Sequence, residues 1–338
     1  MRLSFIIPFY NGKKYIAECL DSLYQQDIPI NEYEVIIVDD CSNDGESRTL
    51  LTTLEVQHSN LRIIHNERNS RCGESRNHGV REAKGQYIWF VDQDDYIAPD
   101  CLSSLLNYCE MGQLDMLTFD YRNVSDDLTL NSKQNLIQIN SSIQKGLDYI
   151  QDVCCGDFWN AEYDTNVWHS IFRRQFLVDN EIFSPEVSYC EDMIVAQHAI
   201  ISAKRMQSIS DDYYRYRCNP NSVFHTEVGV KGRPIFDASI YAGHAIASLS
   251  QLISNEYSNL KDAVYQGGVG RINSFTKVIL KISSKERKSF FEQVKYHRTI
   301  VLQALPYMTP RNKWIATHPK VVMYIPHLIY AYIKLKEL

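Results

Sequence analysis

The sequence predicts an α/β fold in which a mostly parallel central sheet is flanked by helices and followed by a helical C-terminal region. In the N-terminal third of the 338 residues, short β-branched and aromatic runs alternate with stretches whose apolar residues recur at helical spacing. Such alternation is typical of βαβ units, whose strands are parallel. Polar, turn-forming segments follow directly on three of the runs, and beyond residue 232 the apolar period is helical.

Each predicted element rests on its local pattern. The run EVIIV at residues 34–38 is apolar throughout, as in a strand buried on both faces, and the turn formers DDCSNDG follow it. The predicted strands are Leu3–Phe9, Glu34–Val38, Leu61–His65, Tyr87–Val91 and Met116–Tyr121. The predicted helices of the same region are Lys14–Gln26, Ser47–Val56, Ser75–Ala83 and Pro99–Cys109.

The alternation weakens after Asp95, and this marks the organisation of the chain. We predict a boundary near Val230, which divides a nucleotide-binding-type domain at 1–230 from a helical region at 231–338.

The charge distribution is uneven. The chain has a net charge of −6, but residues 270–338 hold thirteen Lys and Arg against three Asp and Glu, a net +10, so residues 1–269 carry −16. An acidic body is a poor nucleic-acid binder, and we expect no nucleic-acid partner. It suits a cation-dependent enzyme whose basic tail contacts an anionic surface.

The apolar segments do not predict a membrane span. The run from Val321 to Ile333 is interrupted by Pro326 and His327 and is shorter than the ~20 residues that cross a bilayer. The first eight residues are too short for a secretory signal. We therefore expect a cytoplasmic protein.

Three carboxylates lie within four residues, at Asp92, Asp94 and Asp95, directly after a predicted strand. In parallel sheets, ligands bind where the strands end, and Pro8 and the pair Asp39–Asp40 hold the same position after other strands. Clustered carboxylates repel one another unless a cation lies between them, and oxygen ligands favour Mg²⁺ or Mn²⁺. The alternative is a solvated acidic turn that caps the next helix.

Four strings in order resemble the family 2 glycosyltransferases of the GT-A fold, of the bacterial polysaccharide-biosynthesis type. They are IPFYN at 7–11, VDDCSNDG at 38–45, SRNHG at 75–79 and DQDD at 92–95. Two later strings, VWHSIFRR at 167–174 and YCEDM at 189–193, extend the resemblance to about residues 1–225.

The resemblance implies a nucleotide-sugar site. Its residues would be Pro8, Phe9, Asp39, Asp40, Asn69, Arg76, Asn77, Asp92 and Arg217. Asp40 would bind the base, in the family usually uracil, whereas Asp39 is as readily a structural turn residue. Arg76 would face the diphosphate or be an ordinary surface charge. Many relatives have glycine where this chain has Arg71, so the loop that contains Asn69 is expected to differ.

The resemblance also implies a Mn²⁺ or Mg²⁺ cofactor, with Asp94 as a direct ligand, Asp92 beside it and His225 as a further ligand. A loop histidine is more often an ordinary surface residue, and that alternative stays open. For the acceptor, Trp168 would stack on a sugar, unless it belongs to the core.

Catalysis is expected from the Glu-Asp string. Asp192 would be the general base that takes the proton of the acceptor hydroxyl, and Glu191 its neighbour would orient acceptor or base. The alternative is that both only open a helix, where acidic residues suit the helix dipole.

These inferences predict an inverting, metal-dependent glycosyltransferase that moves a sugar from a nucleotide-sugar, a UDP-sugar by resemblance, to a saccharide or polyprenyl-linked acceptor. The basic C-terminal residues would contact the inner face of the plasma membrane, pack on the domain, or form a homodimer. Two other classes stay open: a nucleotidyltransferase that makes sugar nucleotides, and a Ca²⁺-dependent saccharide-binding protein.

Overall fold

The computed structural model describes residues 1–125, 129–130, 141–154, 166–187, 189–219, 237–279, 285, 287–288 and 298–318. The chain forms two compact units. The first comprises Met1–Glu186 and Glu191–Asn219, and the second comprises Val187–Cys190 and Pro220–Leu338. The predicted boundary at Val230 lies outside the described residues.

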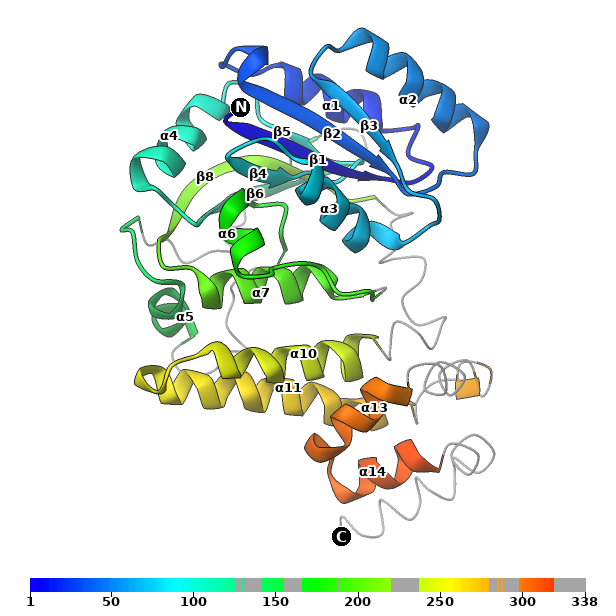
Figure 1. Ribbon diagram of the computed structural model, residues 1–338, viewed down its shortest axis with the longest axis vertical. Coiled ribbons are helices and arrows are strands. Elements are labelled where there is room, and N and C mark those ends of the chain that lie inside the picture. Colours follow the sequence, from blue (N-terminus) through cyan, green and yellow to red (C-terminus); the bar gives the residue numbers. More distant parts are fainter. Residues whose placement is uncertain are drawn as a thin grey trace. The chain divides into compact units, whose positions relative to one another are not determined.

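Eight described strands of the first unit form one sheet (Figure 1). Their order is β3 (Leu61–His65), β2 (Tyr33–Asp39), β1 (Leu3–Phe9), β4 (Tyr87–Phe90), β7 (Ser170–Arg173), β6 (Met116–Val124), β8 (Met206–Arg217) and β5 (Tyr96–Ile97). The β3-β2-β1-β4 half is parallel, as predicted. The other half is mixed, because β7 pairs antiparallel with both β4 and β6, while β6 and β8 are parallel.

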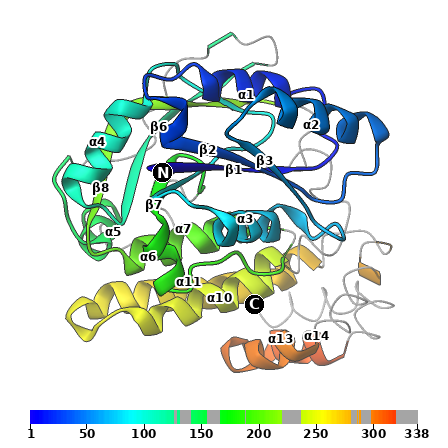
Figure 2. The same ribbon diagram turned by 45° about the horizontal axis from the view of Figure 1, so that its top comes forward.

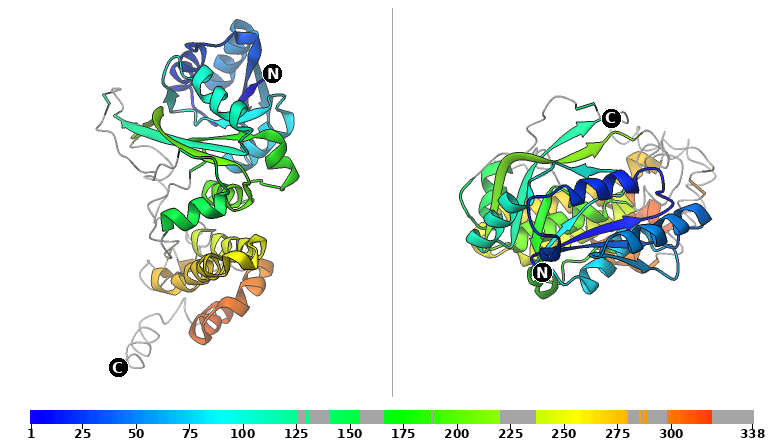
Figure 3. Two further views of the ribbon diagram at one scale, coloured as in Figure 1. Left: turned by 90° about the vertical axis from the view of Figure 1, so that its left-hand side faces the viewer. Right: turned by 90° about the horizontal axis from the view of Figure 1, so that it is seen from above.

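Helices cover both faces of this sheet, as Figure 2 and Figure 3 show from other directions. They are α1 (Ile16–Tyr24), α2 (Gly45–Gln57), α3 (Arg71–Glu82), α4 (Leu102–Gly112), α5 (Gly146–Cys154), α6 (Arg174–Asp179) and α7 (Glu191–Ser202). The predicted α/β class is therefore confirmed.

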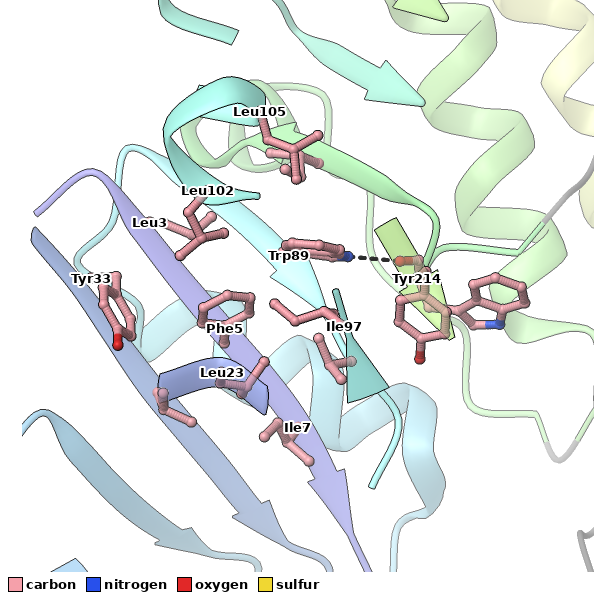
Figure 4. Close-up of a cluster of buried hydrophobic side chains, with 14 of the residues drawn as sticks. Leu3, Phe5, Ile7, Leu23, Tyr33, Trp89, Ile97, Leu102, Leu105 and Tyr214 are labelled. Atoms are coloured by element: carbon pink, nitrogen blue, oxygen red, sulfur yellow. Dashed lines mark hydrogen bonds between the residues drawn. The ribbon is translucent and has the colours of Figure 1, made fainter. Parts of the chain in front are cut away.

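The main core lies on the face of the sheet that α1 and α4 cover. Side chains alternate along β1, so Leu3, Phe5 and Ile7 point into this core, where Leu23 of α1 and Leu102 of α4 also lie (Figure 4). Each fully buried side chain of this size contributes roughly 1.5–3 kcal/mol.

The opposite face of β1 holds α3 in place. A Cβ atom on Gly79 would lie 2.3 Å from Cγ2 of Ile6, so the helix approaches the strand more closely than any residue with a side chain would allow. This close approach fixes the height of α3 above the sheet.

Helix α3 begins at Arg71, four residues before the predicted start. Both oxygens of Asp40 accept hydrogen bonds from the chain at this end, from the N–H groups of Ser70 at 2.8 Å and of Arg71 at 2.7 Å. A carboxylate is favourable at a helix N-terminus, both as a hydrogen-bond acceptor and through the helix dipole. The cap is supplied from about 30 positions upstream in the sequence, which local periodicity does not reveal.

The described elements of the second unit are helical, as predicted, and include α10 (Ala242–Leu249), α11 (Ser258–Ile279), α13 (Arg298–Ala304) and α14 (Pro310–Thr317). Among the described residues, no helix is both long and apolar enough to cross a membrane. The basic segment between Lys320 and Lys336, predicted to contact a membrane or another subunit, lies outside the described residues.

Candidate active site

The loops that follow β1, β2 and β4 meet at the carboxyl edge of the parallel half of the sheet. Phe9 pairs with Asp39 at the ends of β1 and β2, and the N–H of Asn11 donates to Oγ of Ser42 at 3.0 Å. The loop after β4 joins them where the N–H of Tyr10 donates to Oε1 of Gln93 at 3.0 Å. The three segments predicted to converge on one site are therefore in contact.

The side chains of Asp39 and Asp40 form hydrogen bonds that hold the loops at this edge of the sheet. Oδ1 of Asp39 accepts from the N–H of Ser42 at 3.0 Å, and its Oδ2 lies 3.0 Å from Nδ1 of His65. Besides capping α3, Oδ1 of Asp40 accepts from Nδ2 of Asn66 at 2.8 Å. Asp39 thus has the structural role considered as its alternative, and recognition of a base by Asp40 stays a prediction.

The loop that leads into α3 contains the predicted departure from the family pattern. Arg71 has a φ of 77°, in the left-handed region that favours glycine. Arg71 therefore adopts a backbone conformation that a glycine would adopt without strain. Its N–H is bound by Asp40. Asn69, predicted to approach the ribose or diphosphate, is exposed in this loop.

The acidic loop after β4 is held by the end of β8. Oδ2 of Asp95 accepts from the hydroxyl of Tyr214 at 2.7 Å, and its Oδ1 accepts from the N–H of Arg217 at 2.8 Å. The same Tyr214 hydroxyl accepts from the N–H of Asp92 at 3.1 Å, and Nδ2 of Asn219 donates to Oδ2 of Asp94 at 3.0 Å. Asp95 is thus the buried anchor of the loop and not its helix cap.

Burial and mutual repulsion disfavour the charged forms of Asp94 and Asp95. Burial raises the pKa of Asp94, and the charge of Asp92 raises it further. Burial and the charge of Asp94 raise the pKa of Asp95 well above its usual range. A cation beside Asp92 and Asp94 would offset this repulsion.

Arg217 was expected at the nucleotide, and its guanidinium is bound by neighbouring protein groups. Nε donates to the backbone oxygen of Asp94 at 2.7 Å and Nη2 to Oε2 of Glu18 at 2.8 Å, while the ring of Tyr15 lies 4.9 Å away. The side chain is 2% exposed. In this structure Arg217 supports the acidic loop, and Glu18 is a partner that the sequence did not indicate.

Arg76 connects the acidic loop with the start of α7. Its Nη2 donates to Oδ1 of Asp92 at 2.7 Å, and its Nη1 donates to Oε1 of Glu191 at 3.3 Å. The side chain is 6% exposed, which excludes the alternative of an ordinary surface charge. The nearby carboxylates, Asp192 included, raise the pKa of Arg76 despite its burial, so the guanidinium stays protonated.

Glu191 and Asp192 open α7 beside Arg76. Oδ1 of Asp192 accepts from the N–H of Met193 at 2.8 Å. Burial first, and then the charge of Glu191, raise the pKa of Asp192 to about 7, against the opposing effect of Arg76. A carboxyl group with a pKa near neutrality is suited to accept and release protons at the operating pH.

Asn77 was predicted beside the diphosphate or ribose, and the structure gives it another role. Its Nδ2 donates to the backbone oxygen of Ser184 at 2.8 Å, and its Oδ1 accepts from the N–H of Ser184 at 2.8 Å. Because the buried amide is bound on both sides by one backbone position, it holds the segment that precedes α7.

Trp168 belongs to the core, and the prediction that it stacks on an acceptor is wrong for this arrangement. The residue is 4% exposed. Its ring stacks on Tyr214 at 4.6 Å and on Tyr216 at 5.4 Å, and its backbone oxygen accepts the indole hydrogen of Trp89 at 2.7 Å, drawn as the dashed line in Figure 4.

The described residues contain no group of three or more His, Cys, Asp or Glu side chains arranged to hold a metal ion. His225, the third predicted ligand, lies outside the described residues. Mg²⁺ and Mn²⁺ are commonly bound by one or two carboxylates together with substrate phosphates and water. Asp92 and Asp94, with the raised pKa of Asp94, fit such a site.

Comparisons with known proteins identify similar sequences and structures. The family model described as Glycosyl transferase family 2 matches residues 4–163. The poly(ribitol-phosphate) β-N-acetylglucosaminyltransferase TarS of Staphylococcus aureus is 31% identical over 224 residues, which are 64% of this chain and 35% of that relative. The uncharacterized glycosyltransferase EpsJ of Bacillus subtilis is 30% identical over 234 residues, 68% of this chain and 64% of the relative.

The fold has a solved counterpart. A crystal structure of S. aureus TarS 1–349 superposes with a TM-score of 0.66 at 23% identity, covering 99% of this chain and 92% of that one. The same fragment has been solved in complex with UDP-GlcNAc, with a TM-score of 0.65 at 22% identity. The chain spans about a third of the full length of TarS.

Proposed function

The chain carries a family 2 glycosyltransferase domain, and from this premise we propose that the protein transfers a sugar from a UDP-sugar to a hydroxyl group of a saccharide or lipid-linked acceptor, with inversion, in the synthesis of a bacterial surface polysaccharide. The relative TarS, named as a glycosyltransferase of poly(ribitol-phosphate) and crystallised with UDP-GlcNAc, supports this class of donor and product.

One observation carries the proposal. Arg76 binds Asp92 of the acidic loop and Glu191 of α7 with the same guanidinium. Asp92, on the donor side of the proposed site, and Glu191, on the acceptor side, therefore lie on either side of one buried cation. A single-displacement reaction needs these two groups near one another, because the acceptor attacks the anomeric carbon while the diphosphate departs.

In the proposed reaction, Asp192 is the general base. Its Oδ1 is bound by the N–H of Met193, so we assign the acceptor proton to Oδ2. As the proton moves to this oxygen, the acceptor oxygen bonds to the anomeric carbon, and the bond from that carbon to the diphosphate breaks with its electron pair leaving on the nucleoside diphosphate. A pKa of about 7 lets Asp192 take up this proton near neutral pH.

The donor side must stabilise the leaving diphosphate. Asp94 and Asp92 would hold Mn²⁺ or Mg²⁺, which when bound would supply Lewis-acid stabilisation of the developing negative charge. Tyr214 and Arg217 keep the loop in place, and Arg76 prevents Asp92 from repelling Glu191.

Thermal melting tests the proposal. The protein is melted with UDP, GDP, CMP or dTDP, each with Mn²⁺ or with chelator, and UDP release from UDP-sugars is followed separately. A ligand that binds the folded state raises the melting temperature, so we expect an increase with UDP that the chelator removes. Binding of saccharide and Ca²⁺ without any nucleotide, or release of pyrophosphate from a nucleoside triphosphate, would instead support one of the two other classes.

A further inference from the structure

One face of α3 contacts the segment that contains the candidate base. Gly73, Arg76 and Asn77 follow the i, i+3, i+4 spacing that places side chains on a common helix face. Asn77 binds the backbone of Ser184 twice, and Arg76 binds Glu191. All three helix positions thus face Ser184 or Glu191, the first residue of α7.

Gly73 provides the closest approach on this face. A Cβ atom on Gly73 would lie 2.9 Å from Cβ of Ser184 and 3.0 Å from Cγ of Glu191. Distances of this size require the neighbouring atoms to move. Glycine is also a poorer helix former than alanine, so its presence in the first turn of α3 calls for a local reason. The approach of Glu191 to the helix supplies that reason.

The other end of α3 is fixed on the sheet by the contact of Gly79 with Ile6. The helix therefore cannot easily retreat from Glu191 if a side chain is added at Gly73. Such a side chain would displace Glu191 and with it Asp192, the next residue along α7.

We propose that the face of α3 formed by Gly73, Arg76 and Asn77, called the α3 platform below, positions the Glu191–Asp192 pair, and that Gly73 sets its distance from the helix. This inference rests on the proposed function, since it assigns a purpose to the position of the base. The members of the platform are positioning residues, because they act through Glu191 and Ser184.

The test is the Gly73→Ala variant of the full chain. We expect the variant to fold, to bind UDP with Mn²⁺ like wild type in melting experiments, and to keep the donor KM within about twofold, while kcat for UDP release falls on the order of 10- to 100-fold. The assay uses UDP-GlcNAc or UDP-glucose, whichever the wild type cleaves faster, with water as acceptor. Adding Ser184→Gly, which removes the 2.9 Å contact, is expected to restore part of kcat.

Gly270→Ala is the matched control, because Gly270 lies in α11 and a Cβ atom there would meet nothing within 4 Å. It reports the effect of a helix glycine-to-alanine change alone. Wild-type kcat in Gly73→Ala would overturn the platform, and so would a parallel loss of kcat and UDP binding.

A crystal structure of Gly73→Ala separates this inference from the proposed function. If the wild type cleaves no UDP-sugar, the proposed function fails, but the platform is still tested by the position of Glu191. We expect Oε1 of Glu191 to move beyond hydrogen-bond distance of Nη1 of Arg76, now 3.3 Å. An unmoved Glu191 would overturn the inference.

Discussion

Arg76 and Asp92 are joined by a 2.7 Å hydrogen bond between Nη2 and Oδ1, with the arginine side chain almost fully buried. Because the second nitrogen of the guanidinium reaches Glu191, one cation holds together the acidic loop and the start of α7, which lie almost 100 residues apart in the chain. A buried pair of this kind is costly to break, since removing one partner leaves the other charge in a poorly solvated position.

Arg76→Met is therefore expected to destabilise the fold by about 3 kcal/mol at pH 8, toward the lower part of the range for buried pairs because Asp92 is partly exposed. Arg76→Lys keeps the positive charge, so we expect it to lower the free energy of unfolding by less than Arg76→Met does. Urea unfolding of the three proteins measures the difference. A Met variant as stable as wild type would show that the two carboxylates find other compensation.

The pKa of Asp192 predicts the pH dependence of turnover. The base must be ionised, so kcat/KM should fall about tenfold per pH unit below a pKa of about 7 and level off above it. Glu191 raises this pKa by its negative charge, so Glu191→Gln should move the acidic limb of the profile to lower pH. Initial rates between pH 5 and 9 measure both profiles, and an unmoved or opposite limb would contradict the assignment.

Asp192→Asn separates binding from chemistry. The amide cannot accept the acceptor proton, so UDP release should become undetectable, while the UDP-dependent rise in melting temperature should persist. Folding raises the pKa of Asp192 from an unfolded value of 3.8 to about 7. The protonated carboxyl therefore contributes its full stabilisation below about pH 4, and this contribution is lost as the pH rises through about 7. The variant should therefore gain stability over wild type as pH increases from 4 to 8. Wild-type turnover in Asp192→Asn would rule out its role as base.

Asp94→Asn tests the metal site. Burial and the charge of Asp92 raise the pKa of Asp94, so its neutral replacement should leave the apo fold at least as stable. The Mn²⁺-dependent part of UDP binding should be lost, as in wild type with chelator, which titration calorimetry with UDP would show. Asp100→Asn is the control, because Asp100 is exposed and has a φ of 52°, a conformation that asparagine tolerates. Equal Mn²⁺ dependence in both variants would contradict the site.

The sequence was most informative where function and fold depend on local pattern. Strands β1 to β4 and the acidic loop that follows them were predicted because buried parallel strands are apolar runs that end in turn formers. Glu191 and Asp192 were predicted as catalytic residues because their string resembles a known motif. These predictions needed no knowledge of which distant residues meet.

The contacts that the sequence did not indicate join residues far apart in the chain. Asn77 and Ser184 are 107 positions apart, and Arg217 reaches Glu18 across 199 positions. The sequence alone does not distinguish an amide or a guanidinium that faces a ligand from one that binds a backbone carbonyl near the same site. For Trp168, the sequence pattern was compatible both with a place in the core and with contact to an acceptor. Only its packing against Tyr214 decides for the core.

Tyr214 offers the most direct test of how the acidic loop is built. Its buried hydroxyl donates to Oδ2 of Asp95 and accepts from the N–H of Asp92, so Tyr214→Phe removes two hydrogen bonds without changing the stacking of the ring on Trp168. Leaving a buried carboxylate and an N–H group undersatisfied costs about 1–3 kcal/mol for each group, which urea unfolding would detect.

The functional consequence follows from the position of the lost bonds. Asp92 and Asp95 would be less fixed, and we expect Mn²⁺-dependent UDP binding to weaken by about tenfold, the equivalent of one lost hydrogen bond of ~1.4 kcal/mol. Tyr216→Phe is the matched control, since its ring also stacks on Trp168, at 5.4 Å. If both variants lost stability and UDP binding equally, the effect would come from the loss of any hydroxyl in this aromatic cluster, and the bridge from Tyr214 to the acidic loop would have no separate role.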